Sequence, residues 1–308
     1  MSGHTLRKRY MRHFSGLTRY NTLNGRLIVA GFFGQIVAAL VTGHVILHHT
    51  TGWSRYAILA LLMVFIATRL RGLNNIVHEC SHATFVEDRA ENQFLGSLCA
   101  SAVLSCYKDY RDEHLTHHQH LGDYDHDMDL QGIEGLGLHD PLTPKTIARH
   151  LVTPLIGRHL PYYLCANLSA RDGKGFLAFK IGLIVSAFIF LALQPLTALL
   201  MVFIPFVLLY SALNYWTDCM DHAGLIESDD ELEASRNIVA PGSLRWLLFP
   251  RSDCFHLVHH LFPQVPARHL ESCHQLLEWD EEYVAHPNAS SRQKNGRQNR
   301  PSVAVPAE

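Results

Sequence analysis

The chain has 308 residues, of which 48% are hydrophobic and only 18% are charged, and its formal net charge is −2. This charge balance argues against nucleic acid as a partner, because phosphate binding needs a concentrated basic face. The seven cysteines include no C-x-x-C pair, so neither a disulfide framework nor a structural zinc knuckle is indicated. The apolar residues are gathered into long runs, a pattern typical of membrane proteins.

The first part of the chain predicts a cytosolic basic segment followed by a membrane hairpin. Residues 1–26 carry six basic side chains, namely Arg7, Lys8, Arg9, Arg12, Arg19 and Arg26. The apolar run 27–47 follows, and its 21 residues give about 31 Å of helix, enough to cross the hydrocarbon of a bilayer. After a short polar break, a second apolar run covers residues 54–68. The two runs predict an antiparallel pair of transmembrane helices.

The rest of the chain predicts a second hairpin and a cap. The apolar stretch 94–107 has only 14 residues, so we expect a re-entrant or buried segment. Residues 176–193 and 196–216 are separated by a Gln-Pro turn and predict two further spans. The predicted fold is therefore an all-α integral membrane domain over residues 27–285, with four transmembrane helices in two hairpins and a cytosolic helical cap. The polar tail, residues 286–308, is expected to be disordered.

The basic residues predict the orientation of this domain. Six precede the first span, Arg55 alone lies between the first two spans, and none lies in the turn at Gln194 and Pro195. Because cytosolic loops carry the excess of lysine and arginine, both hairpin tips are expected to face outward. Every cluster of histidines then lies on the cytosolic side. We expect a multi-pass protein of a bacterial inner membrane rather than of the endoplasmic reticulum.

Histidine is the unusual feature of the composition, with 22 residues, eight of which fall in three short boxes. The boxes are HECSH (His78 and His82), HLTHH (His114, His117 and His118) and HLVHH (His256, His259 and His260). Offsets of three and four place imidazoles near one another on a helix. A protein zinc ion takes about four ligands, so eight imidazoles exceed the need of one ion. The count predicts two metals, and imidazole suits zinc, copper, iron and nickel.

Other interpretations of these motifs are open. HECSH also fits the H-E-x-x-H signature of a zinc metalloprotease, in which Glu79 would be the general base. A carrier that binds heme or metal without catalysis is a further alternative. The segment 123–134 spaces its acids like a calcium loop, but Met128 occupies the position where glycine makes the turn.

The three boxes in this order, placed after paired hydrophobic hairpins, resemble the membrane fatty acid desaturase superfamily, which includes related hydroxylases, acetylenases and ketolases. The most specific pieces are RDEHLTHHQHLGDYDHDMD (111–129) and FHLVHHLFPQVPARHL (255–270). The resemblance implies two iron ions cycling between Fe2+ and Fe3+, activation of O2, and removal of hydrogen from an unactivated C–H bond. The eight box histidines would be ligands, and His222, just after the last span, would be a ninth.

The resemblance also implies four supporting residues: Asp218, Glu79, Asp129 and Asn237. Some family members have asparagine at the position of Asp218, so this chain departs from that pattern. The Asp218 carboxylate would either bind metal or orient His222. Glu79 would be a filler of the first box or a partner of an imidazole.

The predicted reaction is desaturation of a lipid or fatty acyl chain, with hydroxylation, triple-bond formation or other C–H oxidation as alternatives. No dinucleotide fingerprint and no iron–sulfur or heme segment is visible in the sequence. Electrons are therefore expected from an external ferredoxin or b-type cytochrome with its reductase. The carrier of the substrate is open, because a phospholipid, a thioester and a free acid all remain possible.

Overall fold

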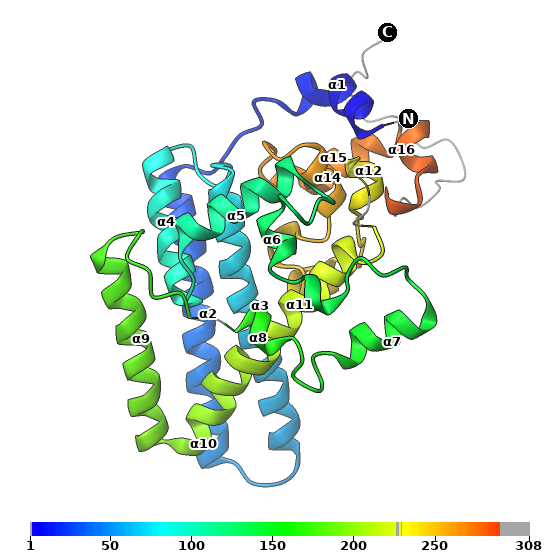
Figure 1. Cartoon of the computed structure of the whole chain (residues 1–308). Helices are drawn as coiled ribbons and strands as arrows, with labels where there is room; N and C mark the ends of the chain where they lie inside the picture. The colour runs from blue at the N-terminus through cyan, green and yellow to red at the C-terminus, as the bar shows by residue number, and fades with distance from the viewer. Residues whose placement is uncertain (1, 165, 226–227, 229, 290–308) are drawn as a thin grey trace.

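The computed structural model describes residues 2–164, 166–225, 228 and 230–289. Within these ranges the chain is helical, with one isolated bridge between Tyr20 and Val86 and no strand. Helices α2 and α3 pack side by side in one half of the molecule, which also contains α9, and α14 to α16 lie with α1 at the opposite end (Figure 1). The prediction of an all-α integral membrane protein is confirmed.

Four helices are long and apolar enough to cross a membrane: α2 (Thr22–His49), α3 (Ser54–Ser81), α9 (Lys174–Leu193) and a continuous segment from Pro195 to His222. The Asn21 side chain caps α2 by accepting the Asn24 N–H at 2.8 Å. The last segment comprises α10 (Pro195–Ala198), the wider turns of η2 (Leu199–Tyr210) and α11 (Ser211–His222). Pro195 stands at the start of α10, where a backbone N–H would have no partner within the helix, so its lack of an N–H costs nothing there.

Helix α3 joins the membrane half to the cap. The apolar run predicted an end near residue 68, but the helix continues to Ser81. Its last turns stay helical because their polar side chains are buried against residues 246–253. Arg69 donates to the carbonyl of Trp246 at 2.8 Å, and Asn75 donates to that of Pro250 at 2.7 Å. This extension carries the first histidine box from the membrane toward the cap.

Two shorter helices pack beside α3. Helix α4 (Arg89–Ala102) covers most of the segment expected to be re-entrant, and its 14 residues contact α3 along its buried face. Helix α5 (Tyr107–Gln119) begins where Asp172 accepts the backbone N–H groups of Tyr107 and Lys108, at 2.7 and 3.0 Å. Its buried residues include His114 and His117. The second histidine box is thereby held against the end of α3.

The cap is assembled from short elements with a common hydrophobic core. They are α12 (Glu231–Ala234), α13 (Gly242–Leu248), η3 (Pro250–Ser252), α14 (His256–Leu261), η4 (Ala267–His269), α15 (Leu270–Leu277), α16 (Glu281–Ala285) and η5 (Pro287–Ala289). The basic N-terminal segment contributes α1 (Gly3–Phe14), whose Phe14 ring meets Phe262 edge-to-face at 4.7 Å. Most of the tail expected to be disordered, residues 290–308, lies outside the described residues.

Residues 128–168 link α5 to the second hairpin. They form α6 (Met128–Gln131), η1 (Glu134–Leu136), α7 (Pro144–Val152) and α8 (Leu160–Tyr163). Several large apolar side chains of this segment are exposed, including Leu151, Leu155 and Ile156. Exposed apolar side chains beside basic residues suit a helix lying at a membrane surface.

Candidate metal centre

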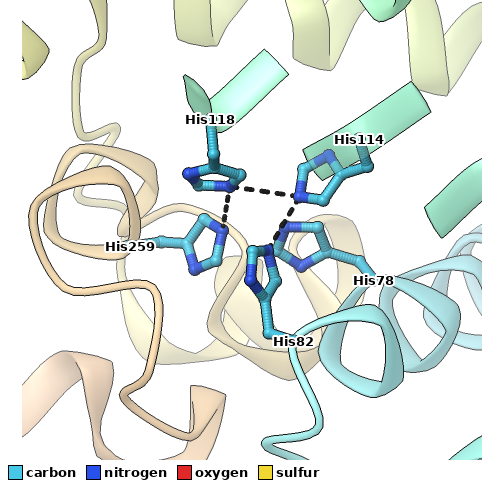
Figure 2. A group of neighbouring side chains, drawn as sticks. All are labelled: His78, His82, His114, His118 and His259. Carbon is cyan, nitrogen blue, oxygen red and sulfur yellow. Dashed lines mark hydrogen bonds between the residues drawn. The ribbon is translucent and has the colours of Figure 1, made fainter. Parts of the chain in front are cut away.

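Five of the predicted ligands gather in one group, shown in Figure 2: His78, His82, His114, His118 and His259. They come from the end of α3, from α5 and from α14. The Nε2 atom of His114 lies 2.9 Å from that of His82 and 3.1 Å from that of His118. The Nε2 atoms of His118 and His259 are 3.0 Å apart. The nitrogens therefore point at a common space.

The other four predicted ligands form a second group: His117, His222, His256 and His260. The Nε2 atom of His256 lies 2.8 Å from that of His222 and 2.9 Å from that of His260. The His117 ring centroid is 4.8 Å from that of His222. All nine histidines named from the sequence thus fall into two groups, which touch where the rings of His118 and His260 stack at 4.4 Å.

Each H-x-x-H-H box is divided between the two groups. On α5, the residues at offsets zero and four, His114 and His118, join the group of five, and His117 joins the group of four. On α14 the arrangement is reversed, because His256 and His260 join the group of four and His259 crosses to the other. The boxes alone suggested that each forms a local cluster. The structure shows instead that each of the two H-x-x-H-H boxes contributes histidines to both groups.

The spacing of the nitrogens fits metal coordination. With metal–nitrogen bonds of about 2.1 Å, two ligands at a right angle stand about 3.0 Å apart, and two in a tetrahedron about 3.4 Å apart. The observed separations of 2.8 to 3.1 Å are close to this range, so the nitrogens of each group could bind one metal ion together. Because each group offers at least four imidazoles, the donor set can hold two metal ions.

Burial keeps the imidazoles ready to bind metal. It lowers the pKa of His82, His114, His118, His256, His259 and His260 well below the ordinary value of a histidine. At neutral pH these rings are uncharged and each keeps a free lone pair. His117 differs: burial lowers its pKa, but the hydrogen bond and charge of Asp127 outweigh burial and leave the pKa raised.

Groups on the far side of the rings fix which nitrogen faces the metal space. His222 donates from Nδ1 to the carbonyl of Ala234 at 2.9 Å, and the His117 Nδ1 lies 2.7 Å from a carboxylate oxygen of Asp127. Longer contacts of 3.5 Å join His256 to Asp221 and of 3.6 Å join His114 to Asp129. Such partners orient a ligand ring and raise its basicity.

The four predicted supporting residues lie in different places. Asp129 approaches His114. The Asp218 carboxylate accepts the Tyr163 hydroxyl at 2.6 Å. Asn237 binds the Tyr283 hydroxyl at 2.8 Å and accepts the N–H of Val258, within α14. Glu79 is buried and forms two hydrogen bonds with Arg251, at 2.7 and 2.8 Å. The Glu79 carboxylate is thus engaged by a cation, which does not suit a general base.

Sequence reasoning missed two supporting carboxylates, Asp127 and Asp221. Asp127 also caps α6, where it accepts the N–H groups of Asp129 and Leu130. It stands in the DHDMD stretch singled out for its acids, so its signal was present there. Asp127 is also one of the acids in the segment spaced like a calcium loop, and here its carboxylate binds a helix N-terminus and a histidine. Asp221 directly precedes His222, and only the fold shows that it reaches His256.

A cavity of about 680 Å3 lies against both histidine groups. Its lining includes His78 and His114 from one group, and His117, His222 and His256 from the other. It extends to Phe206 and Tyr210 in the last span and to side chains of α5 and of residues 162–164, 166 and 167. A ligand in this cavity would lie next to the metal space.

Fold and site together describe an integral membrane protein with two groups of histidines that could hold metal ions. The profile of the Fatty acid desaturase family matches residues 51–289, which is more than half of the chain. The chain therefore belongs to the fatty acid desaturase family, as the histidine boxes predicted. This membership removes the zinc protease interpretation of HECSH.

Individual relatives carry different substrates in their names. Dihydrorhizobitoxine desaturase of Bradyrhizobium elkanii is 28% identical over 234 residues, which cover 70% of this chain and 65% of that protein. A chloroplastic sn-2 acyl-lipid omega-3 desaturase (ferredoxin) of Arabidopsis thaliana is 30% identical over 45% of this chain and 30% of its own length. An acyl-lipid omega-3 desaturase (cytochrome b5) of the same plant is 24% identical, over 63% and 56%. The chain spans less than two thirds of the length of each.

Proposed function

We propose that this protein is an O2-dependent desaturase that holds two iron ions in its two histidine groups. The observation that carries the proposal is the gathering of nine neutral or carboxylate-supported imidazoles into groups of five and four. Family membership and the desaturases among the relatives support an oxidoreductase. Bound iron would supply the O2 chemistry that removes hydrogen from an unactivated C–H bond.

The overall reaction fixes what must come from outside. A CH2–CH2 unit loses two hydrogen atoms and becomes CH=CH, while O2, two electrons and two protons yield two water molecules with those hydrogens. The electrons would come from a ferredoxin or a b-type cytochrome with its reductase, as the names of two relatives support. We place the site on the cytosolic side of a membrane, a bacterial inner membrane in particular, where such carriers can reach it.

The residues of the chain would contribute position and environment. The His117–Asp127 and His222–Ala234 contacts hold the rings in one tautomer. The cavity walls would hold the substrate so that one carbon lies within about 3.5 Å of the oxidant, which sets the position of the double bond. If the second hydrogen does not leave and oxygen is transferred instead, the product is an alcohol, so a hydroxylase is the alternative. Relatives named for acyl-lipids support a lipid substrate.

Expression in a bacterial host with a simple lipid profile tests the reaction. Mass spectrometry of lipids and small metabolites should find a product two mass units lighter than its precursor. A matched His118→Ala variant, which lacks one ligand of the group of five, should not form that product. A product heavier by one oxygen atom would assign hydroxylation. If the unaltered protein gives the same products as His118→Ala, the proposal is wrong.

A further inference from the structure

The cavity beside the histidine groups is lined mostly by polar side chains, five of which are predicted metal ligands. Thirty residues line it, and only nine of them, counting glycine and methionine, have no polar group in the side chain. Amide side chains of Asn74, Asn75, Asn167 and Asn214 are among the others. Three of these amides are hydrogen-bonded within the protein, Asn75 to Pro250, Asn167 to Asp109 and Asn214 to Arg71. A methylene chain that filled the cavity would still strip water from the other polar side chains of the wall without offering them a hydrogen bond, which is unfavourable. The volume of about 680 Å3 admits many small molecules as well as a chain.

Acidic side chains outnumber lysine and arginine in the cavity wall. Five carboxylates line the cavity, and Arg71 is the one lysine or arginine among its thirty lining residues. Arg71 is already paired with Asp253, and Asp221 lies 3.5 Å from the His256 ring. The other three, Glu113, Asp129 and Asp218, form no ion pair with an arginine or lysine of the described residues. We name these three the carboxylate wall.

Aromatic side chains accompany the carboxylate wall. Tyr110, Tyr162, Tyr163 and Tyr210 line the same cavity, together with Phe206. Tyr163 is joined directly to the wall, because its hydroxyl donates to Asp218 at 2.6 Å. Aromatic faces attract cations through their quadrupole, and quaternary ammonium groups are bound by such rings in many proteins. Acidic and aromatic side chains in one cavity favour the same kind of ligand.

We propose that the substrate of this enzyme carries a positively charged amino group, and that the carboxylate wall and its tyrosines bind that group. This inference rests on the proposed desaturase function and specifies its substrate class. The cationic group holds the substrate in the cavity, and a neighbouring C–H bond faces the histidine groups. Either a membrane lipid with an amine headgroup or a small water-soluble amine provides this chemistry.

Binding calorimetry on the metal-loaded protein in lipid nanodiscs tests the proposal. The probes are hexyltrimethylammonium, hexanol and hexanoate, which share a six-carbon chain and differ in charge. A quaternary ammonium has no lone pair, so it cannot bind as a metal ligand. We expect hexyltrimethylammonium to bind at least tenfold more tightly than the other two.

Variants locate the binding group. Asp218→Asn keeps an acceptor for the Tyr163 hydroxyl and removes one negative charge, so the affinity for hexyltrimethylammonium should fall about tenfold while hexanol binding stays unchanged. The matched control is Asp125→Asn, which removes a charge from an exposed residue outside the cavity and should have no effect. The proposal is overturned if hexanol or hexanoate binds as tightly as the ammonium probe, or if Asp218→Asn leaves ammonium affinity unchanged.

The nanodisc lipid separates the two sources of the amine. If a headgroup is the natural ligand, discs of phosphatidylethanolamine should weaken probe binding compared with discs of digalactosyldiacylglycerol, a lipid with no amine and no net charge. Equal binding in both supports a water-soluble amine. Metal content distinguishes this proposal from the underlying function. A protein with two irons that fails the binding tests remains a desaturase with a different substrate, whereas one bound zinc refutes the desaturase itself.

Discussion

The position of each histidine within its box, on two short helices, decides which of the two histidine groups it joins. In the H-x-x-H-H box of α5, His114 and His118 belong to the group of five, but His117 belongs to the group of four. In the box of α14, His256 and His260 belong to the group of four, but His259 belongs to the group of five. Neither group can be completed by one box. Because His118 and His259 come within 3.0 Å at their Nε2 atoms, α5 and α14 must dock correctly before either group forms. Metal binding is therefore expected to stabilise the docked arrangement.

The buried partner of His117 provides a prediction about metal affinity. Asp127→Asn retains a good cap for α6 but replaces the charged acceptor of the His117 N–H. The group of four should bind metal about 10- to 100-fold more weakly. Chelator competition followed by metal analysis measures this loss.

The control for Asp127→Asn is Asp123→Asn. Asp123 has a contact of the same length, 2.7 Å, with His126, but both side chains are exposed and outside the metal groups. Equal loss of metal from the two variants, or none from Asp127→Asn, would show that the His117–Asp127 pair has no special role.

The pair of Glu79 and Arg251 separates a structural role from a catalytic one. Glu79→Gln leaves the buried Arg251 cation without its partner, and such a loss costs about 3–5 kcal/mol of stability. Urea unfolding should show the destabilisation, and adding Arg251→Met in the same chain should recover much of it. A Glu79→Gln protein of normal stability that lacks activity would instead assign Glu79 a chemical role.

At the residue scale, the number and helical spacing of the box histidines pointed to eight of the nine that come together, and the resemblance to the desaturase superfamily added His222. The sequence could not divide them into groups, since that depends on how α5 and α14 are rotated against each other. Glu79 was expected to be either a filler of the first box or a partner of an imidazole, whereas the fold pairs it with Arg251, 172 positions away in the chain.

At the scale of elements, apolar runs located all four spans but not the end of α3. The run stops near residue 68, and the helix continues because cap residues supply partners for Arg69 and Asn75. Those partners lie more than 170 residues away, so no local pattern reveals them. Likewise α1 was expected only as a basic segment, although Leu6, Tyr10 and Phe14 pack into the core of the cap.

Helix α9 carries a buried lysine that anchors the cavity wall. Lys180 donates from Nζ to the carbonyls of Ser105, Asn167 and Ser169, at 3.2, 2.6 and 3.2 Å. Lys180→Met should remove these bonds at a cost of about 1.5–3 kcal/mol and loosen residues 103–105 and 166–169. Hydrogen–deuterium exchange should become faster there, while Lys174→Met, at the exposed start of α9, should leave exchange unchanged. Unchanged exchange in Lys180→Met would mean that packing alone holds this wall.

At the scale of the whole molecule, the nine predicted ligands gather where the ends of α3 and α11 meet α5 and, in the cap, α14. The basic residues predict that both hairpin tips face away from the cytosol. Single cysteines at Trp53 and Gln194 should therefore react with an impermeant maleimide on intact cells, and one at Lys8 only after permeabilisation. Native cysteines give little background where they are buried, as are Cys80, Cys99, Cys106, Cys254 and Cys273. Labelling of Lys8→Cys on intact cells would invert the orientation.

The central claim is that the two histidine groups hold two irons, and the metal content of the purified protein tests it most directly. Mass spectrometry of the metals, scaled to protein concentration, should give two irons per chain. The value should fall toward one in a His222→Ala, His256→Ala double variant, which removes half of the group of four. A single zinc ion with no iron in the unaltered protein would contradict the account.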